Sequence, residues 1–121
     1  MFEGVDELAQ ATVTRLSVPV LDADCASEFA AKAESLPSSL PLILDLSRLE
    51  FTDSSGIGCL LSLQRTLVEE GSHLSIAGLQ PRVRALFELV QLHRVIDVFN
   101  DVDEALRTIR SATSPSSPVE V

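Results

Sequence analysis

The sequence has no tryptophan, no tyrosine and only 5 phenylalanines, so its core has to be built from leucine, valine, isoleucine and alanine. Hydrophobic residues still make up 45% of the 121 residues, which is enough to fill the core of one domain of ordinary size. No apolar stretch is long enough to cross a bilayer. The first residues are acidic where a secretory signal peptide is basic. We therefore expect a soluble, cytoplasmic protein.

Basic residues are also few. The chain has 9 Lys and Arg against 18 Asp and Glu, which gives a formal net charge of -9. An acidic chain repels the phosphates of nucleic acids and of anionic lipids. We expect neither nucleic-acid binding nor direct membrane binding, and a partner with a basic patch fits this charge better.

The 2 cysteines and 2 histidines form no pattern typical of a metal or redox site, so no metal and no cofactor is expected. Cys25 and Cys59 both lie among apolar residues, which predicts buried free thiols. His73 and His93 lie in a predicted turn and a predicted connection, where we expect solvated side chains.

Segments typical of strands and of helices alternate along the chain. Short apolar or β-branched runs predict strands at residues 11–18, 41–46, 74–77 and 95–99. Helical spacing of apolar residues predicts helices at about residues 24–36, 54–70, 81–90 and 102–110. Each predicted helix has one buried face. In chain order, the residues of these four faces are Ala26, Phe29, Ala30, Ala33 and Leu36; Ile57, Leu60, Leu61, Gln64, Leu67 and Val68; Val83, Leu86, Phe87 and Val90; and Val102, Ala105, Leu106 and Ile109.

Helix ends are marked by residues that suit them. Asp22 or Asp24 is placed to cap the first helix, and Asp101 with Glu104 is typical of a capping box. Pro81 suits a first helical position. The alternation predicts an α/β domain over residues 1–110, with helices packed on a small, mostly parallel β-sheet. Ser, Thr and Pro without periodicity predict a disordered tail at residues 111–121.

Residues 52–58, TDSSGIG, lie between a predicted strand and a predicted helix. One interpretation is structural: Asp53 or Ser54 caps the helix and Gly56 allows a tight turn. The other is functional, because a serine at a helix start is exposed beside the positive end of the helix dipole. A phosphate there would be tolerated and would add nearly two negative charges.

Enzyme motifs are missing from the sequence. Residues 52–58 match neither a P-loop nor a nucleophile elbow, and neither histidine is placed to activate a serine. No carboxylate pair stands out from a solvated acidic surface. We therefore expect a protein that is not an enzyme.

The chain resembles a STAS domain of the anti-sigma factor antagonist type over about residues 9–110. The residues that support this resemblance are Asp45-Leu46 at the end of a strand, Phe51-x-Asp53-Ser54-Ser55-Gly56-Ile57-Gly58, Pro81-x-Val83-x-x-Leu86-Phe87, and Asp103-Glu104-Ala105. Two segments depart from the family pattern. Family members commonly have a glycine where this chain reads Ser17-Val18-Pro19-Val20, and a Ser-Gly-Leu-like turn where it reads Val90-Gln91-Leu92.

The resemblance implies a switch that is not an enzyme. The unmodified domain binds an anti-sigma factor that is also a serine kinase, and thereby releases a sigma factor. The kinase phosphorylates the serine that matches Ser54, and a serine phosphatase reverses the modification. The residues implied in partner binding are Asp22, Asp53, Ser54, Ser55 and Gly56.

Two other roles use the same fold. The chain could be a scaffold subunit of a stressosome, although such proteins more often have an extra N-terminal module. It could instead be a subunit of a membrane lipid or anion transport complex. An intact Ser54 favours the switch over the transport role.

Overall fold

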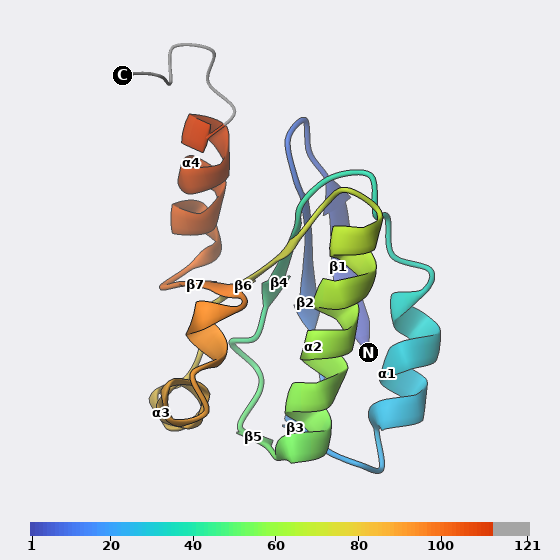
Figure 1. Cartoon of the computed structure of the whole chain (residues 1–121), viewed down its shortest axis with the longest axis vertical. Coiled ribbons are helices and arrows are strands. Elements are labelled where there is room, and N and C mark those ends of the chain that lie inside the picture. The colour runs from blue at the N-terminus through green and yellow to red at the C-terminus, as the bar shows by residue number, and fades with distance from the viewer. Residues whose placement is uncertain (113–121) are drawn as a thin grey trace.

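The computed structural model describes residues 1–112 and shows an α/β fold (Figure 1). Its strands are β1 (Phe2–Glu7), β2 (Thr12–Leu16), β3 (Val20–Leu21), β4 (Leu42–Asp45), β5 (Phe51–Thr52), β6 (Leu74–Ala77) and β7 (Asp97–Phe99). Its helices are α1 (Ala26–Ala33), α2 (Ser54–Glu69), α3 (Pro81–Leu89), the 3-10 helix η1 (Leu92–Arg94) and α4 (Val102–Ala112).

The main sheet has five strands in the order β1-β2-β4-β6-β7. The strand β1 pairs antiparallel with β2, and the remaining pairs are parallel. The strands β3 and β5 form a separate parallel pair. The predicted α/β class with a small, mostly parallel sheet is therefore confirmed.

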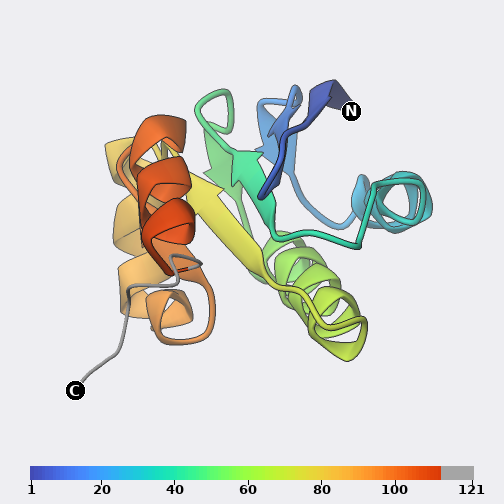
Figure 2. The same cartoon turned by 90° about the horizontal axis from the view of Figure 1, so that it is seen from above.

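The helices cover both faces of the sheet (Figure 2). Successive strand residues point to opposite faces, so Leu42 and Leu44 enter one core while Ile43 enters the other. The larger core is completed by α1, α2 and α3, and the smaller one by Ala105 and Ile109 of α4. Because β4 is a central strand that is covered on both faces, its apolar residues do not alternate with polar ones in the sequence.

Several local predictions are confirmed. Pro81 occupies the first turn of α3. At the start of α4, the Asp101 carboxylate accepts a hydrogen bond from the Glu104 N–H at 2.7 Å. The Glu104 carboxylate accepts one from the Asn100 N–H, also at 2.7 Å. In the usual capping box the glutamate accepts from the N–H of the cap residue itself. Here Glu104 accepts from Asn100, the residue before the cap Asp101.

The strand β1 was not predicted, because its acids and Gly4 have low β propensity. Pairing with β2 makes it a strand, with a register shift between Glu3 and Asp6 and a φ of 66° at Gly4. The strand predicted at 95–99 begins only at Asp97, because residues 92–94 form η1 and Val95 ends it.

Three residues of the predicted buried helix faces are exposed in the structure. Ala30, Val68 and Val90 are exposed, because Val68 lies a step of about 100° past the buried Leu67 and Val90 follows the end of α3. Ala30 lines a surface groove. The buried line of α2 is Gly56, Leu60, Leu63 and Leu67.

The sequence predicts that the folded domain ends at residue 110 and that a disordered tail follows. The helix α4 continues to Ala112, two residues past that boundary. The rest of the predicted tail, residues 113–121, lies outside the described residues.

The Gln64 side chain joins three elements. Its amide oxygen accepts a hydrogen bond from the Leu74 N–H at 2.7 Å, where β6 begins. Its amide nitrogen donates to the Val95 carbonyl at 3.0 Å, at the end of η1. This one side chain therefore holds α2 against the sheet and against the segment that precedes β7.

We predict that Gln64→Leu lowers the free energy of unfolding by about 1–3 kcal/mol, because the Leu74 N–H loses its partner. Gln64→Glu should lose less, since a carboxylate still accepts from that N–H. Arg65→Ala changes the neighbouring exposed residue and should stay within about 0.5 kcal/mol of the wild type. Urea unfolding measures all three. A Gln64→Leu protein as stable as the wild type would refute the role of this bridge.

Candidate functional site

The candidate site is built where β3 and β5 end beside the start of α2 (Figure 1). The two strands pair in parallel, with Leu21 opposite Thr52. The buried Thr52 hydroxyl donates a hydrogen bond to the Leu21 carbonyl at 2.7 Å. Because carboxyl ends of parallel strands meet at one edge, the next residues, Asp22 and Asp53, leave the strands side by side.

Asp53 is the N-cap of α2. Its carboxylate accepts a hydrogen bond from the Gly56 N–H at 3.1 Å, and its carbonyl accepts one from the Ile57 N–H at 2.9 Å. Ser54 and Ser55 are the first two helical residues and are exposed. Neither hydroxyl makes a hydrogen bond in the described part of the chain. Of the two predicted caps, Asp53 does the capping, and the Ser54 hydroxyl is left exposed.

Gly56 is needed for space and not for a tight turn, which corrects the prediction. It lies inside the first turn of α2, and its φ is not positive. A Cβ at this position would overlap the Thr52 hydroxyl and the Leu21 carbonyl. Gly56 therefore allows α2 to start directly against the β3–β5 pair.

Asp22 does not cap α1, although it was one of the two residues predicted to do so. Its carboxylate accepts a hydrogen bond from the Asp24 N–H at 3.0 Å and shapes the turn after β3. The N-cap of α1 is Cys25, which makes no side-chain capping bond. Neither Asp22 nor Asp24 caps that helix, because the turn delays its start to Ala26.

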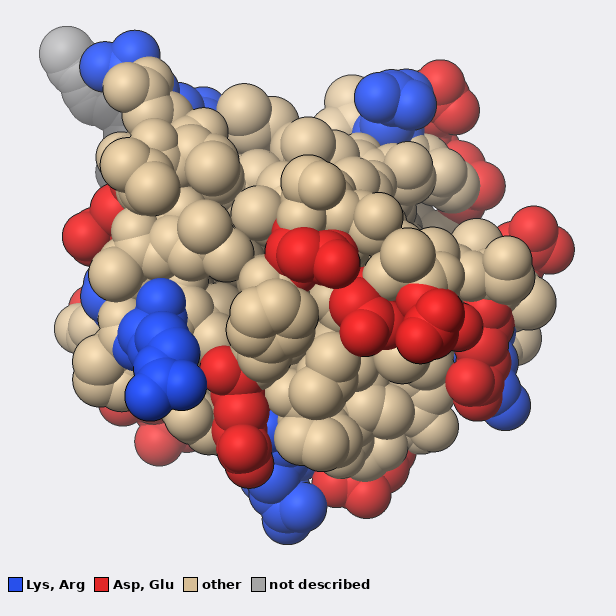
Figure 3. Space-filling view, turned by 90° about the horizontal axis from the view of Figure 1, so that it is seen from below, with Lys and Arg blue, Asp and Glu red and all other residues tan. Residues whose placement is uncertain are grey.

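The end of the molecule that holds β3, β5 and the start of α2 is acidic. Figure 3 shows this end, with acidic side chains in a broken band across the middle and right and basic ones to the left and along the margin. Glu50 and Asp24 are exposed, and Asp22 and Asp53 are half-buried. An acidic surface of this kind favours a partner with basic groups.

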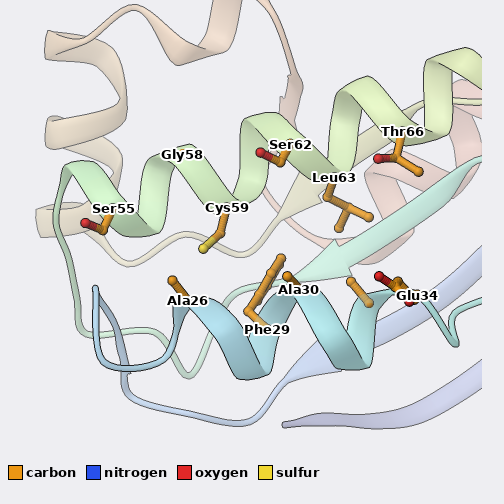
Figure 4. A pocket seen from close by; sticks show the side chains of 11 residues that line it. Ala26, Phe29, Ala30, Glu34, Ser55, Gly58, Cys59, Ser62, Leu63 and Thr66 are labelled. Atoms are coloured by element: carbon orange, nitrogen blue, oxygen red, sulfur yellow. The ribbon is translucent and has the colours of Figure 1, made fainter.

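A groove of about 560 Å³ runs between α1 and α2 (Figure 4). Small side chains form most of its walls, and Phe29 and Leu63 are its largest apolar residues. Ser55 lines the groove, whereas Ser54 does not. The two adjacent serines therefore face different surroundings, as consecutive helical residues do.

The two cysteines are free but only partly buried, which corrects the prediction of buried thiols. Both lie at the edge of the larger core, and Cys59 also lines the groove. Burial raises the pKa of the Cys59 thiol, and the nearby Cys25 and Asp53 raise it further. The folded chain therefore keeps this thiol protonated to a higher pH than an ordinary cysteine.

The two histidines lie apart from the groove. His73 is half-buried just before β6, and His93 is exposed in η1; neither lines the groove. Among residues 1–112 no three His, Cys, Asp or Glu side chains are gathered to hold a metal ion. None of the helices formed by those residues could span a bilayer.

The fold is shared by regulatory and transport proteins. An anti-sigma factor antagonist (STAS) domain protein from Planctomyces limnophilus superposes with a TM-score of 0.73 at 22% identity, over 89% of this chain and 97% of that one. The murine solute carrier 26 family member A9 anion transporter gives a TM-score of 0.73 at 22% identity, over 87% of this chain and 18% of that one. The class defined by the fold is thus a STAS-like α/β domain.

The chain belongs to the STAS domain family, whose profile matches residues 6–105. A curated relative, the anti-sigma F factor antagonist of Paenibacillus polymyxa, is 26% identical over 65 residues. That alignment covers 54% of this chain and 56% of the relative, so the chain spans about half the length of the curated relative it matches.

We predict opposite effects for two glycines of the same helix. Gly56→Ala should lower the free energy of unfolding by about 1–3 kcal/mol, because its methyl group overlaps Thr52 and Leu21. Gly58→Ala should raise it by about 0.5–1 kcal/mol, since a Cβ there meets no atom within 4 Å and alanine favours helix. Thermal or urea unfolding compares the two. Equal changes in the free energy of unfolding for the two variants would show that contact with Thr52 and Leu21 does not exclude a side chain at position 56.

We also predict that the Cys59 thiol titrates at a higher pH in the folded chain than in the urea-unfolded chain. The Cys25→Ser variant leaves one thiol, and its ultraviolet thiolate absorbance follows the titration. A raised folded pKa means that this thiol's stabilising contribution is constant below about pH 8.5, the ordinary thiol pKa, and is lost as the pH rises further. A lower pKa in the folded chain would contradict the burial argument.

Proposed function

We propose that this chain is an anti-sigma factor antagonist. In its unmodified form it binds an anti-sigma factor serine kinase, and phosphorylation of Ser54 by that kinase switches the binding off. The main observation in support is the exposed Ser54 hydroxyl at the start of α2, where Asp53 and not the serine caps the helix. A serine that neither caps nor packs can be modified without loss of a structural contact. The name of the Paenibacillus polymyxa relative supports the partner class.

The proposed modification is an ordinary phosphoryl transfer. The Ser54 hydroxyl oxygen attacks the terminal phosphorus of ATP, the bond from that phosphorus to the bridging oxygen breaks, and ADP leaves. A base on the kinase accepts the hydroxyl proton. A serine phosphatase restores the hydroxyl by hydrolysis. The proposed role belongs in the bacterial cytoplasm, where sigma factors act.

Phosphorylation weakens docking for a local reason. A kinase must hold the Ser54 hydroxyl against the phosphates of its nucleotide. After transfer, the phosphoserine adds nearly two negative charges beside ADP and beside Asp53. The fold tolerates the new group, because the first N–H groups of α2 and the helix dipole favour an anion at this point.

A second candidate function is supported by the murine anion transporter, whose fold includes the same domain. A STAS subunit of a membrane lipid or anion transport complex would bind a transporter in place of a kinase. The exposed Ser54 favours the switch, because docking on a transporter does not require a free hydroxyl at the start of α2.

We predict that an anti-sigma serine kinase from the same genome, with ATP, adds one phosphate to the wild-type chain and none to Ser54→Ala. Ser55→Ala, the adjacent exposed serine, should be phosphorylated like the wild type. Intact-mass and peptide mass spectrometry measure both. The phosphorylated chain should bind the ADP-loaded kinase at least about tenfold more weakly, by the like-charge repulsion described above.

Three results would contradict this proposal. Phosphate found on Ser55 would show that Ser55, and not Ser54, is the acceptor. Phosphorylation that leaves the affinity for the kinase unchanged would show that it does not switch the binding off. If no kinase of this class binds the chain and a membrane transporter co-purifies with it, the transport role replaces the proposed one.

A further inference from the structure

Phe51 stands out from the other aromatic residues. All 5 phenylalanines lie in the described part of the chain, where Phe29 and Phe87 are fully buried and Phe2 and Phe99 are partly buried. Phe51 is 52% exposed. With no tryptophan or tyrosine in the sequence, it is the one exposed aromatic side chain of residues 1–112, and it precedes Ser54 by three residues.

The backbone holds Phe51 outward. In β5 the Thr52 side chain points inward and bonds to Leu21, so strand alternation turns Phe51 to solvent. The Phe51 N–H donates a hydrogen bond to the Pro19 carbonyl at 3.1 Å, and the Glu50 N–H donates to the same oxygen at 2.7 Å. The backbone that carries the ring is therefore held by hydrogen bonds, and little backbone entropy is lost when a partner covers the ring.

Acidic groups flank this ring. Glu50 precedes Phe51 and is exposed, and Asp22 and Asp53 follow the two strands of the β3–β5 pair. Figure 3 shows the same end of the molecule with its band of acidic side chains. A lone exposed phenylalanine is unremarkable on a protein surface. An exposed aromatic ring with acidic groups beside it is the arrangement of an interface anchor and part of its rim.

We propose that Phe51 is the apolar anchor of the docking surface, and that its partner is a protein with an apolar pocket ringed by lysine or arginine. Such a partner matches both the ring and the net charge of -9. A second copy of this chain does not, because it would bring the same acidic surface against the first.

This inference rests on the proposed function and adds the chemistry of the partner to it. The basic ring around the pocket attracts Glu50 and Asp24, whereas the nucleotide phosphates of the kinase lie against Ser54. Attraction at the rim and repulsion at the phosphoserine therefore act at different points of one surface. Phosphorylation can end binding although the rest of the partner's surface is basic.

The first test measures the affinity of the unphosphorylated chain for the kinase that modifies Ser54. Phe51→Ala should weaken binding by about 10- to 100-fold through faster dissociation, as loss of an interface anchor does. Val68→Ala is the matched control, because Val68 is 54% exposed at the opposite end of α2. It should stay within about twofold. Asp24→Asn should slow association and reduce its salt dependence. Equal effects of Phe51→Ala and Val68→Ala would overturn the inference.

The second test does not depend on the kinase. Photo-reactive benzoylphenylalanine is placed at position 51, and at position 68 as the control, in cells that produce the full chain. Mass spectrometry identifies the partner and the crosslinked peptide. We expect position 51 to crosslink a kinase at an apolar pocket lined by lysine or arginine. A transporter captured at such a pocket would overturn the proposed function and keep the docking inference. Capture of a second copy, equal capture from position 68, or no capture from position 51 would overturn the inference itself.

Discussion

The close contact between Gly56 and the β3–β5 pair is the constraint on which the candidate site depends. Thr52 and Leu21 are already joined by a buried hydrogen bond, and α2 begins directly against that bond because Gly56 has no side chain. This contact sets where the helix starts. It thereby places Asp53 as cap and Ser54 as an exposed first residue. A bulkier residue would push α2 outward and move the serine relative to both acids.

The same contact explains how one small region combines rigidity with exposure. The side chains that hold it, Thr52 and Asp53, are used inside the fold, so Ser54 and Phe51 are left to solvent. The exposed Ser54 hydroxyl and the Phe51 ring therefore belong to neighbouring elements of a preformed surface, which the proposed partner would meet. The proposed phosphorylation would change the charge of this surface without requiring a change of fold.

Much of the fold could be predicted from short-range patterns. The apolar run of β4, the strand at 74–77, Pro81 at the start of α3 and the Asp101–Glu104 cap follow from local chemistry. The edge strand β1 could not be predicted in this way, because its acids favour no strand until β2 supplies hydrogen bonds. The exposure of Val68 could not be predicted either, since the orientation of α2 on the sheet decides which side of a mixed helix is covered.

For the site, the sequence by itself determined the residue types: an acid suited to capping, two serines, a glycine and the match to the STAS family. These are local properties of residues 52–58. Only the tertiary structure decided which acid caps, why the glycine is required and which serine lines the groove. It also decided that Phe51 faces solvent beside Ser54. The physical reason is that these outcomes depend on segments distant in the sequence. The strand β3, about thirty residues earlier, pairs with β5 only in the folded protein, and α1 forms the other wall of the groove.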